Sequence, residues 1–342
     1  MASKFAFFVV RRGVNAIITL ILMIALIFII IQLVAPTPID KAIIYAGPRM
    51  TQQELLQIAN RYGFNQPVWN QFVNYVVNFF QGNFGIDSIF GIPELTVMER
   101  YFPITLDMVV LGNILGVVVG IFTGAIAASN RNTPTDYGIK AIYLGTWAAP
   151  PFLVAILLQL VLAYDLGLLP TTGIANPVLA APAAVTGLPL IDSLLAQNWV
   201  YLYSYLQHLI LPALSIAVIS FGAITRITRA TMIDALDKDY VKLAYMKGLP
   251  KRQVVYGTAF RNAIIPIITL LAVTFAFSVG GAVIIEDIFS YHGIGYFTVL
   301  AIYDLDYPAI LTTTVIVGIA VIFSNFIADV LYGAMDPRVR LT

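Results

Sequence analysis

Long uncharged stretches alternate with short charged ones along the chain. Six mostly apolar stretches carry no charged residue: 13–39, 108–130, 141–164, 193–225, 262–285 and 307–328. A helix needs about 20 residues to cross a hydrocarbon layer about 30 Å thick. Backbone groups in lipid must also pair within their own segment, so each stretch is predicted to be a helix. The pattern predicts an all-α, polytopic membrane protein with six spans near 13–35, 106–128, 141–163, 208–228, 263–285 and 310–332.

The composition supports a membrane location and limits the kinds of catalytic and metal-binding side chains that the chain offers. The chain is 59% hydrophobic and 11% charged, far from the soluble globular range. The first apolar stretch is too long for a signal-peptide core and lacks a small-residue cleavage pattern, so we expect it to stay as an anchor. With no cysteine and only two histidines, the chain has few groups for thiolate or imidazole chemistry. We therefore expect no catalytic residue and no metal site.

The positive charges are distributed unevenly between the two sides of the predicted bundle. Alternating the six spans puts fifteen of the 19 Lys and Arg on one side, including Arg338 and Arg340 near the C-terminus. The four on the other side fall in one loop of more than 60 residues, where charge has little influence on topology. The count predicts that both termini are cytoplasmic.

The most charged cytoplasmic stretch is DYVKLAYMKGLPKRQVVYGTAFRNAIIP, residues 239–266. Apolar residues recur at helical spacing from Met232 to Ala244, so the segment is predicted to be one amphipathic helix outside the membrane. Gly248 offers a left-handed C-cap, and Pro250 can start a second short helix. A lipid surface, a groove in another protein and packing within the chain are all compatible with the apolar face.

This stretch resembles the cytoplasmic EAA loop of ABC-importer permeases, in particular the dipeptide and oligopeptide branch. At the Glu-Ala-Ala of the general pattern the chain has Lys242, Leu243 and Ala244, and the oligopeptide branch also lacks that Glu. Tyr291-His292 stands where the family often has Trp-Pro. The similarity is nearly end to end, in family order: FVVRRGVNAIITL, RYGFNQPVWNQFVNYVVNFFQGNFGIDS, FPITLDMVVL, DLGLLPTTG, HLILPALSIA, GGAVIIEDIFSYHGIG, LDYPAI and MDPRVR.

The resemblance implies a type I ABC-importer permease fold, with one transmembrane permease domain over 1–342. It implies a large external loop at 36–103 and a cytoplasmic coupling loop at 229–262 whose helix docks into a cleft of an ATPase. The residues expected to couple are Asp239, Tyr240, Lys242, Leu243, Ala244, Lys247, Gly248, Lys251 and Arg252.

The expected partners also follow from the resemblance. They are a second, related permease forming a heterodimer, two cytoplasmic ATPases that use ATP and Mg²⁺, an extracellular solute-binding protein and the lipid of a prokaryotic cell membrane. We expect this chain to bind no cofactor and no nucleic acid, and to be no enzyme.

Few ionisable residues fall near the predicted membrane core. Asp107, Asn325 and Asp329 are candidates for the translocation path, although interhelical hydrogen bonding explains such residues equally well. The default expectation for Glu286 and Asp287 is a solvated acidic pair at the outer end of the fifth span, and the resemblance places them near an external gate.

Two further patterns predict local structure. Gly112, Gly116, Gly120 and Gly124 form a ridge of small residues that lets another helix approach closely. In the external loop, Thr51 and Glu54 form a capping box that predicts a short helix ending near Tyr62.

The leading hypothesis is a permease subunit of an ATP-driven importer for peptides or similarly sized solutes, with oligosaccharides as another cargo class. The chain lacks the phosphate-binding pattern GxxxxGK[ST], so ATP hydrolysis is expected in partner subunits. The alternative, an ion-coupled secondary transporter, calls for buried carboxylates or broken half-helices in related halves. An intramembrane enzyme calls for a cluster of catalytic side chains at depth, which the sequence does not show.

Overall fold

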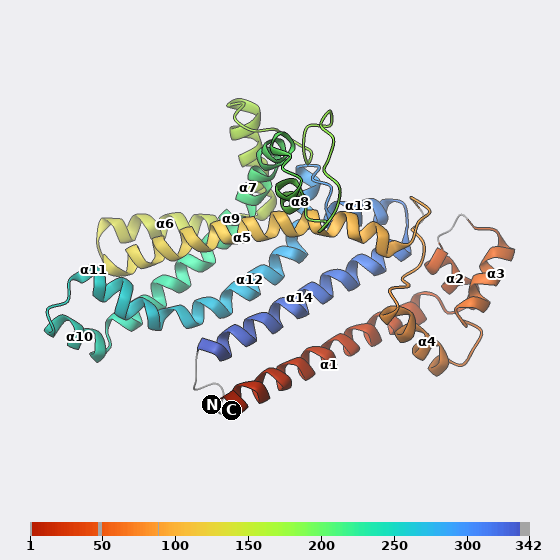
Figure 1. Ribbon diagram of the computed structural model, residues 1–342, viewed down its shortest axis with the longest axis horizontal. Helices are drawn as coiled ribbons and strands as arrows, with labels where there is room; N and C mark the ends of the chain where they lie inside the picture. Colours follow the sequence, from red (N-terminus) through yellow and green to blue (C-terminus); the bar gives the residue numbers. More distant parts are fainter. Residues whose placement is uncertain (1, 47–49, 88, 336–342) are drawn as a thin grey trace.

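The computed structural model describes residues 2–46, 50–87 and 89–335, so Arg338 and Arg340 lie outside the described residues. Over these ranges the chain is helical, apart from one isolated antiparallel bridge between Ile86 and Pro93. Figure 1 shows the arrangement. The elements are α1 (Ala2–Val34), α2 (Pro38–Ala46), α3 (Gln52–Arg61), α4 (Val68–Phe80), α5 (Glu94–Ser129), α6 (Pro134–Ala148), α7 (Pro151–Leu158), the π-helix η1 (Gln159–Asp165), α8 (Pro189–Leu195), α9 (Trp199–Leu236), α10 (Asp239–Met246), α11 (Lys251–Gln253), the π-helix η2 (Val254–Ala259), α12 (Phe260–Ile288), α13 (Ile294–Tyr303) and α14 (Tyr307–Met335).

Four described helices are long and apolar enough to cross a membrane alone, within α1, α5, α9 and α14. The total reaches the predicted six if each of two bent helix pairs counts as one span. The predicted third span, 141–163, is not continuous, because α6 and α7 with η1 meet at 106°. Ala149 and Pro150 are extended there, since a residue before proline avoids the helical region and proline lacks a backbone donor.

The remaining spans are longer than the sequence pattern predicted. α5 begins at Glu94, before its uncharged stretch, and α9 continues to Leu236, past the end of its uncharged stretch, so charged residues extend both helices. α9 continues through Pro212 as one helix. The second bent pair meets at 53°, next to Pro266.

The glycine ridge of α5 packs against α9, as predicted. All four ridge glycines are buried, and a Cβ on Gly112 or Gly116 would lie 2.7 Å from the carbonyl oxygen of Ala213 or Ala217. A Cβ on Gly124 would lie 2.6 Å from the Cβ of Thr228. The absence of side chains therefore brings the two helix backbones together along four turns, and the close packing orients α9 along its length.

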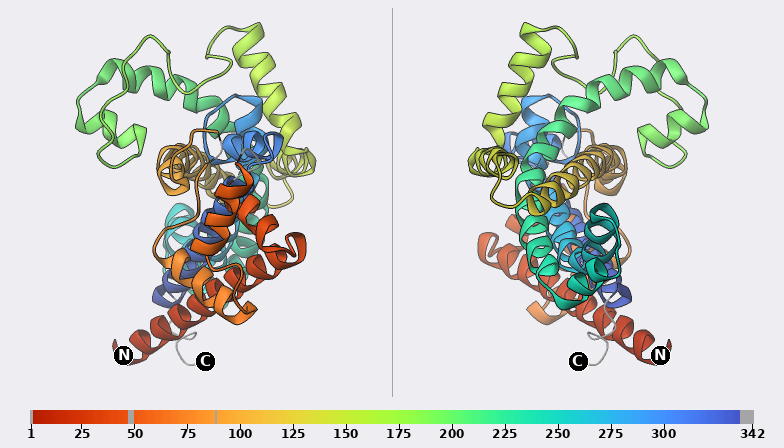
Figure 2. Two further views of the ribbon diagram at one scale, coloured as in Figure 1. Left: turned by 90° about the vertical axis from the view of Figure 1, so that its right-hand side faces the viewer. Right: turned by 90° about the vertical axis from the view of Figure 1, so that its left-hand side faces the viewer.

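The helices α2–α4, within the loop predicted to be external, form a small helical layer at one end of the bundle, drawn at the right of Figure 1. The capping box of α3 is present, with Thr51 and Glu54 exchanging their hydrogen bonds, and Tyr62 is the C-cap. Buried apolar side chains of α2 and α3 join those of α1, and Lys41 donates to Gln71 of α4 over 2.9 Å. Figure 2 shows the segment between η1 and α9 projecting from the bundle.

Candidate coupling loop and translocation site

The predicted coupling loop, 229–262, begins within the last two turns of α9 and lies at the opposite end of the molecule from α2–α4 (Figure 1). The chain does not form the single amphipathic helix that was predicted from Met232 to Ala244. α9 ends at Leu236, Asp237 and Lys238 form a turn, and α10 runs separately from Asp239 to Met246. The apolar positions are therefore divided between two helices.

This division changes which residues face outward. Val241 and Ala244 are buried, packing into a core with Met232, Val254 and Val255. Ala244 therefore lies inside the loop and not on its outer face, contrary to prediction. The exposed apolar residues of α10 are Tyr240, Leu243, Tyr245 and Met246, with exposed fractions of 38%, 52%, 46% and 82%.

Gly248 ends α10 as predicted, in the left-handed conformation with φ +76°. Its N–H donates to the carbonyl of Tyr245, and the N–H of Leu249 donates to that of Ala244. These two bonds form a Schellman motif, which turns the chain sharply and satisfies carbonyls at the helix end. Pro250 precedes α11, which leads through η2 into α12. One short turn therefore joins α10 to the next span.

The charged candidates surround the exposed face of α10. Lys242 donates to Asp239 over 2.9 Å, and both side chains are largely exposed. This hydrogen bond lowers the pKa of Asp239 and raises that of Lys242, since it favours both charged forms. Lys247, Lys251 and Arg252 are also exposed. The loop therefore presents basic side chains around an apolar patch.

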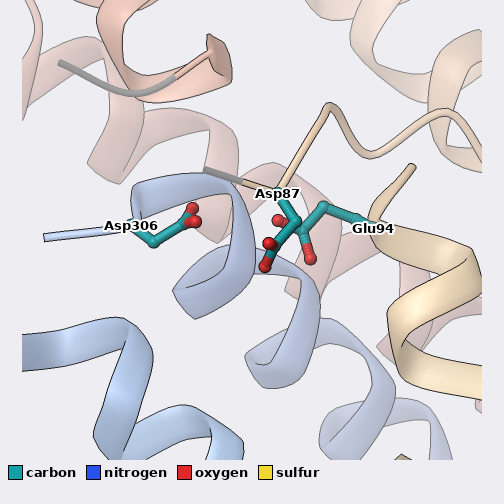
Figure 3. Close-up of side chains that lie close together, drawn as sticks. All are labelled: Asp87, Glu94 and Asp306. Atoms are coloured by element: carbon teal, nitrogen blue, oxygen red, sulfur yellow. The ribbon is translucent and has the colours of Figure 1, made fainter. Parts of the chain in front are cut away.

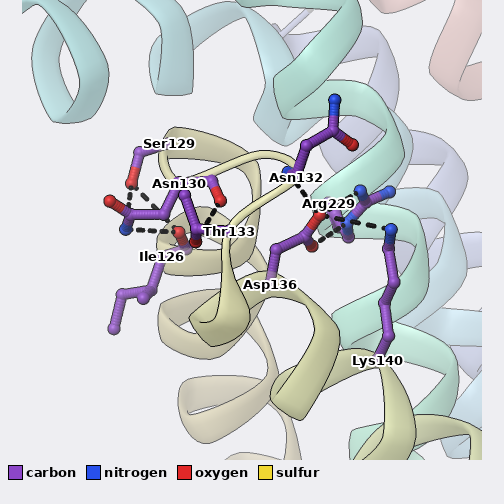
Figure 4. A network of polar contacts seen from close by, with 8 residues as sticks. All are labelled: Ile126, Ser129, Asn130, Asn132, Thr133, Asp136, Lys140 and Arg229. Atoms are coloured by element: carbon purple, nitrogen blue, oxygen red, sulfur yellow. Dashed lines mark hydrogen bonds and ion pairs between the residues drawn. The ribbon is translucent and has the colours of Figure 1, made fainter.

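A buried ion pair that sequence reasoning missed anchors the C-terminal part of α9 (Figure 4). Asp136 of α6 is fully buried and accepts from Nε and Nη2 of Arg229 over 2.6 and 2.8 Å. Lys140 lies 3.2 Å from the same carboxylate, and the N–H of Asn132 donates to it. The bidentate pair joins α6 to α9, about two turns before α9 ends at Leu236. Nothing in the sequence pairs residues 93 positions apart; only packing does so.

A cleft of about 510 Å³ opens between α5, α12 and α14. Its lining is apolar except for Asn113 and Ser324 and includes Val110, Ile114, Val117, Leu271, Phe275 and Ile327. None of the four predicted path residues lines this cleft, all of them being within the described part of the chain. Asn113, which the sequence did not single out, accepts from Ser220 of α9 over 3.2 Å.

Asp107 and Glu286 instead form hydrogen bonds between helices. Asp107 accepts from the Tyr205 hydroxyl over 2.9 Å and from the N–H of Leu190, and Tyr291 donates to Tyr205. Glu286 is fully buried, which corrects the expectation of a solvated pair. It accepts from Thr105 over 2.6 Å and from the N–H of Tyr296. Glu286 thereby joins α5 to α13.

Asn325 and Asp329 lie on α14 but face away from the cleft. Asp329 pairs with Arg12 of α1 over 3.0 Å, with both side chains about one-third exposed. Asn325 is exposed. The contact joins the first and last spans, so Asp329 belongs to the edge of the bundle.

Two family models match this chain. The binding-protein-dependent transport system inner membrane component covers residues 116–341, and the N-terminal model of the same transport systems covers 5–89. The chain is 34% identical over 312 residues to the probable D,D-dipeptide transport permease DdpB of Escherichia coli, covering 91% of each chain. It is 30% identical to the oligopeptide transport permease AppB of Bacillus subtilis, over 98% of this chain and 99% of AppB.

The fold has a counterpart among solved structures. The MetNI methionine ABC transporter in an inward-facing conformation superposes with a TM-score of 0.52 at 15% identity, over 68% of this chain and 93% of that one. At this identity the match supports the helical fold alone. The two family models and the full-length relatives show more: the chain is a multi-pass membrane protein that belongs to the family of binding-protein-dependent transport system inner membrane components.

Proposed function

We propose that this chain is a permease subunit of an ATP-driven importer that moves peptides delivered by an extracellular binding protein. Family membership supports the importer function over an ion-coupled secondary transporter. The peptide class rests on the relatives, which include a D,D-dipeptide, an oligopeptide and a di/tripeptide permease. Oligosaccharides of similar size stay as the second cargo class.

The observation that carries the coupling role is the exposed apolar face of α10, formed by Tyr240, Leu243 and Met246. Such residues exposed together outside a membrane span favour a partner surface. Burying Leu243 and Met246 in a groove of an ATPase would remove their apolar area from water, and the surrounding lysines would meet acidic rim residues. The ion pair of Asp136 and Arg229 holds the end of α9 that precedes α10. A force applied to α10 would therefore be transmitted to the membrane spans.

The orientation follows from the same face. An ATPase that uses cytoplasmic ATP would meet α10 from the cytoplasm, which agrees with the positive-inside count and supports cytoplasmic termini. ATP and Mg²⁺ would be bound by the partner subunits, and this chain would carry out no hydrolysis itself.

The open cleft between α5, α12 and α14 supports a second permease as partner. Its lining is too apolar to serve alone as a wet path for a peptide. A related chain packed over it would complete the pore from two halves, giving a heterodimer on two ATPases.

The coupling role is tested with Leu243→Asp in the assembled complex. A charge in the docking face should greatly reduce co-purification of the ATPase and substrate-stimulated ATP hydrolysis, because an unpaired charge is costly to bury. Leu56→Asp is the matched control, since Leu56 lies on α3 at the other end and is 46% exposed. Normal ATPase recovery and stimulation with Leu243→Asp would refute the assignment.

The cargo class is tested separately. The complex in liposomes, with its binding protein, is given tripeptides or oligosaccharides, and uptake and ATP hydrolysis are measured. We expect stimulation by peptides. Stimulation by oligosaccharides alone would replace the peptide assignment and leave the importer function intact.

A further inference from the structure

Three acidic side chains converge at the end of the bundle opposite α10. Asp87 lies in the hairpin before α5, Glu94 is the first residue of α5, and Asp306 precedes α14. All three are fully buried. One carboxylate oxygen from each lies within 4.8 Å of the others. Figure 3 shows the carboxyl groups of Asp87 and Glu94 next to each other, with that of Asp306 facing them.

Two of these carboxylates have oxygens without a partner. Both oxygens of Glu94 and Oδ2 of Asp87 are buried and accept no hydrogen bond. Among the residues that the structure describes, no Lys or Arg forms an ion pair with Asp87 or Glu94. Buried carboxylates are normally paired or bound to a metal, because the loss of hydration is costly. The oxygens of Asp87 and Glu94 that lack a hydrogen bond therefore offer free lone pairs within the cluster.

Two of the three groups accept backbone hydrogen bonds. Oδ1 of Asp87 accepts from the N–H groups of Ile89 and Phe90. Oδ1 of Asp306 accepts from the N–H of Ala309 over 3.1 Å, at the start of α14. Glu94 occupies the first turn of α5. Backbone donors and helix N-termini favour anions whereas burial opposes their charge, so a bound cation would offset the loss of hydration at these carboxylates.

We propose that Asp87, Glu94 and Asp306 bind a calcium ion. The donors are all hard oxygens, which suit Ca²⁺ and Mg²⁺ and exclude thiolate-bound metals. Ca²⁺ binds oxygen at about 2.3–2.6 Å, and three carboxylate oxygens within 4.8 Å of one another are close enough to contact one such ion. Mg²⁺ gives up its waters reluctantly and is seldom held by protein oxygens alone. The buried site therefore favours Ca²⁺.

The ion would join three segments that are distant in sequence. It would hold the hairpin 86–93 against the first turns of α5 and α14, beside the core formed by Val97, Phe297 and Ala309. In the proposed orientation this end faces outside, where calcium is abundant and sites of about 10⁻⁴–10⁻³ M affinity are useful. The expectation of no metal site considered only thiolate and imidazole ligands and overlooked carboxylates brought together by folding.

Binding is tested first on the full-length chain in detergent. After treatment with EGTA, the melting temperature and bound ⁴⁵Ca²⁺ are measured at 0–5 mM CaCl₂, and the melting temperature at equal MgCl₂. We expect about one Ca²⁺ per chain and a saturable rise of at least about 3 °C, because a ligand that binds only the folded state stabilises it. MgCl₂ should give less than half of this rise. Absence of bound Ca²⁺, or an equal response to Mg²⁺, overturns the proposal.

The ligands are tested with Glu94→Gln, which removes one charge and keeps the side-chain shape. We expect it to lose the calcium response and to be more stable than wild type without calcium, since one of three like charges is gone. Glu99→Gln, an exposed position on the same helix, should keep the full response. A normal calcium response in Glu94→Gln, or its loss in Glu99→Gln, refutes the site. If Glu94→Gln does not fold, the wild-type ⁴⁵Ca²⁺ measurement decides alone. Neither readout depends on transport.

Discussion

Replacement of Gly116 by alanine tests the close packing of α5 on α9. A Cβ at this position would lie 2.7 Å from the carbonyl oxygen of Ala217 and 3.0 Å from the Cβ of Ser220. Ordinary van der Waals contact starts near 3.4 Å. The helices would therefore have to separate locally by about 0.7 Å, and the obstructing atom is backbone, which cannot rotate away.

Two opposing effects determine how far Gly116→Ala lowers the free energy of unfolding. Overpacking in a close-packed interior costs about 1–3 kcal/mol. Alanine is favoured over glycine within a helix by about 0.8–1.0 kcal/mol. Overpacking wins, because separating the helices also loosens the contacts of the neighbouring ridge glycines. We expect a net loss of about 1 kcal/mol, or roughly 2–4 °C in melting temperature.

The assay is thermal unfolding of the purified chain in detergent. Gly145→Ala is the matched control, because Gly145 lies within α6 and an added Cβ would meet nothing within 4 Å. It should leave the melting temperature unchanged or raise it slightly. If Gly116→Ala were as stable as Gly145→Ala, the ridge would not be a close-packed contact and the stated reasoning would be wrong.

Three further predictions concern the coupling loop, its support and its orientation. Gly248→Val should reduce substrate-stimulated ATP hydrolysis without preventing membrane insertion, because a φ of +76° is strained for valine. Asparagine tolerates this conformation, so Gly248→Asn should retain most activity. Equal rates of ATP hydrolysis in both variants would contradict the C-cap argument. Arg229→Met should lower the free energy of unfolding by about 1.5–3 kcal/mol, because it removes two charge-assisted hydrogen bonds from a buried carboxylate and leaves Lys140 as its ion-pair partner. Arg131→Met breaks an exposed pair of 3.7 Å and should cost less than about 1 kcal/mol. Similar losses in unfolding experiments would argue against the network. The chain has no cysteine, so single cysteines can be labelled without background. Gln253→Cys should react with an impermeant thiol reagent only from the cytoplasm, and Gln53→Cys only from outside. The reverse labelling pattern would show that the proposed orientation is wrong.

The sequence alone determined the class, the approximate spans and several local features of this protein. Uncharged stretches predict membrane helices, because charged side chains and backbone groups without a hydrogen-bond partner are unfavourable in lipid. The capping box at Thr51 and the left-handed Gly248 depend on neighbouring residues only, so both were predictable and are present. The glycine ridge was also predictable from the sequence, since four small residues on one helix face are typical of close helix packing. The helix that packs against it was not predictable.

Tertiary structure decided whatever depends on contacts between distant segments. The break after Leu236 turned Ala244 inward, because Val254 and Val255 of η2 provide the apolar surface that buries it. Glu286, taken for a solvated residue, is buried because Thr105 and α13 supply its hydrogen bonds. The cluster of Asp87, Glu94 and Asp306 shows the limit most clearly, since each is an ordinary acid near a helix end in the sequence. Only the packing of α5 and α14 on the hairpin brings the three buried carboxyl groups together.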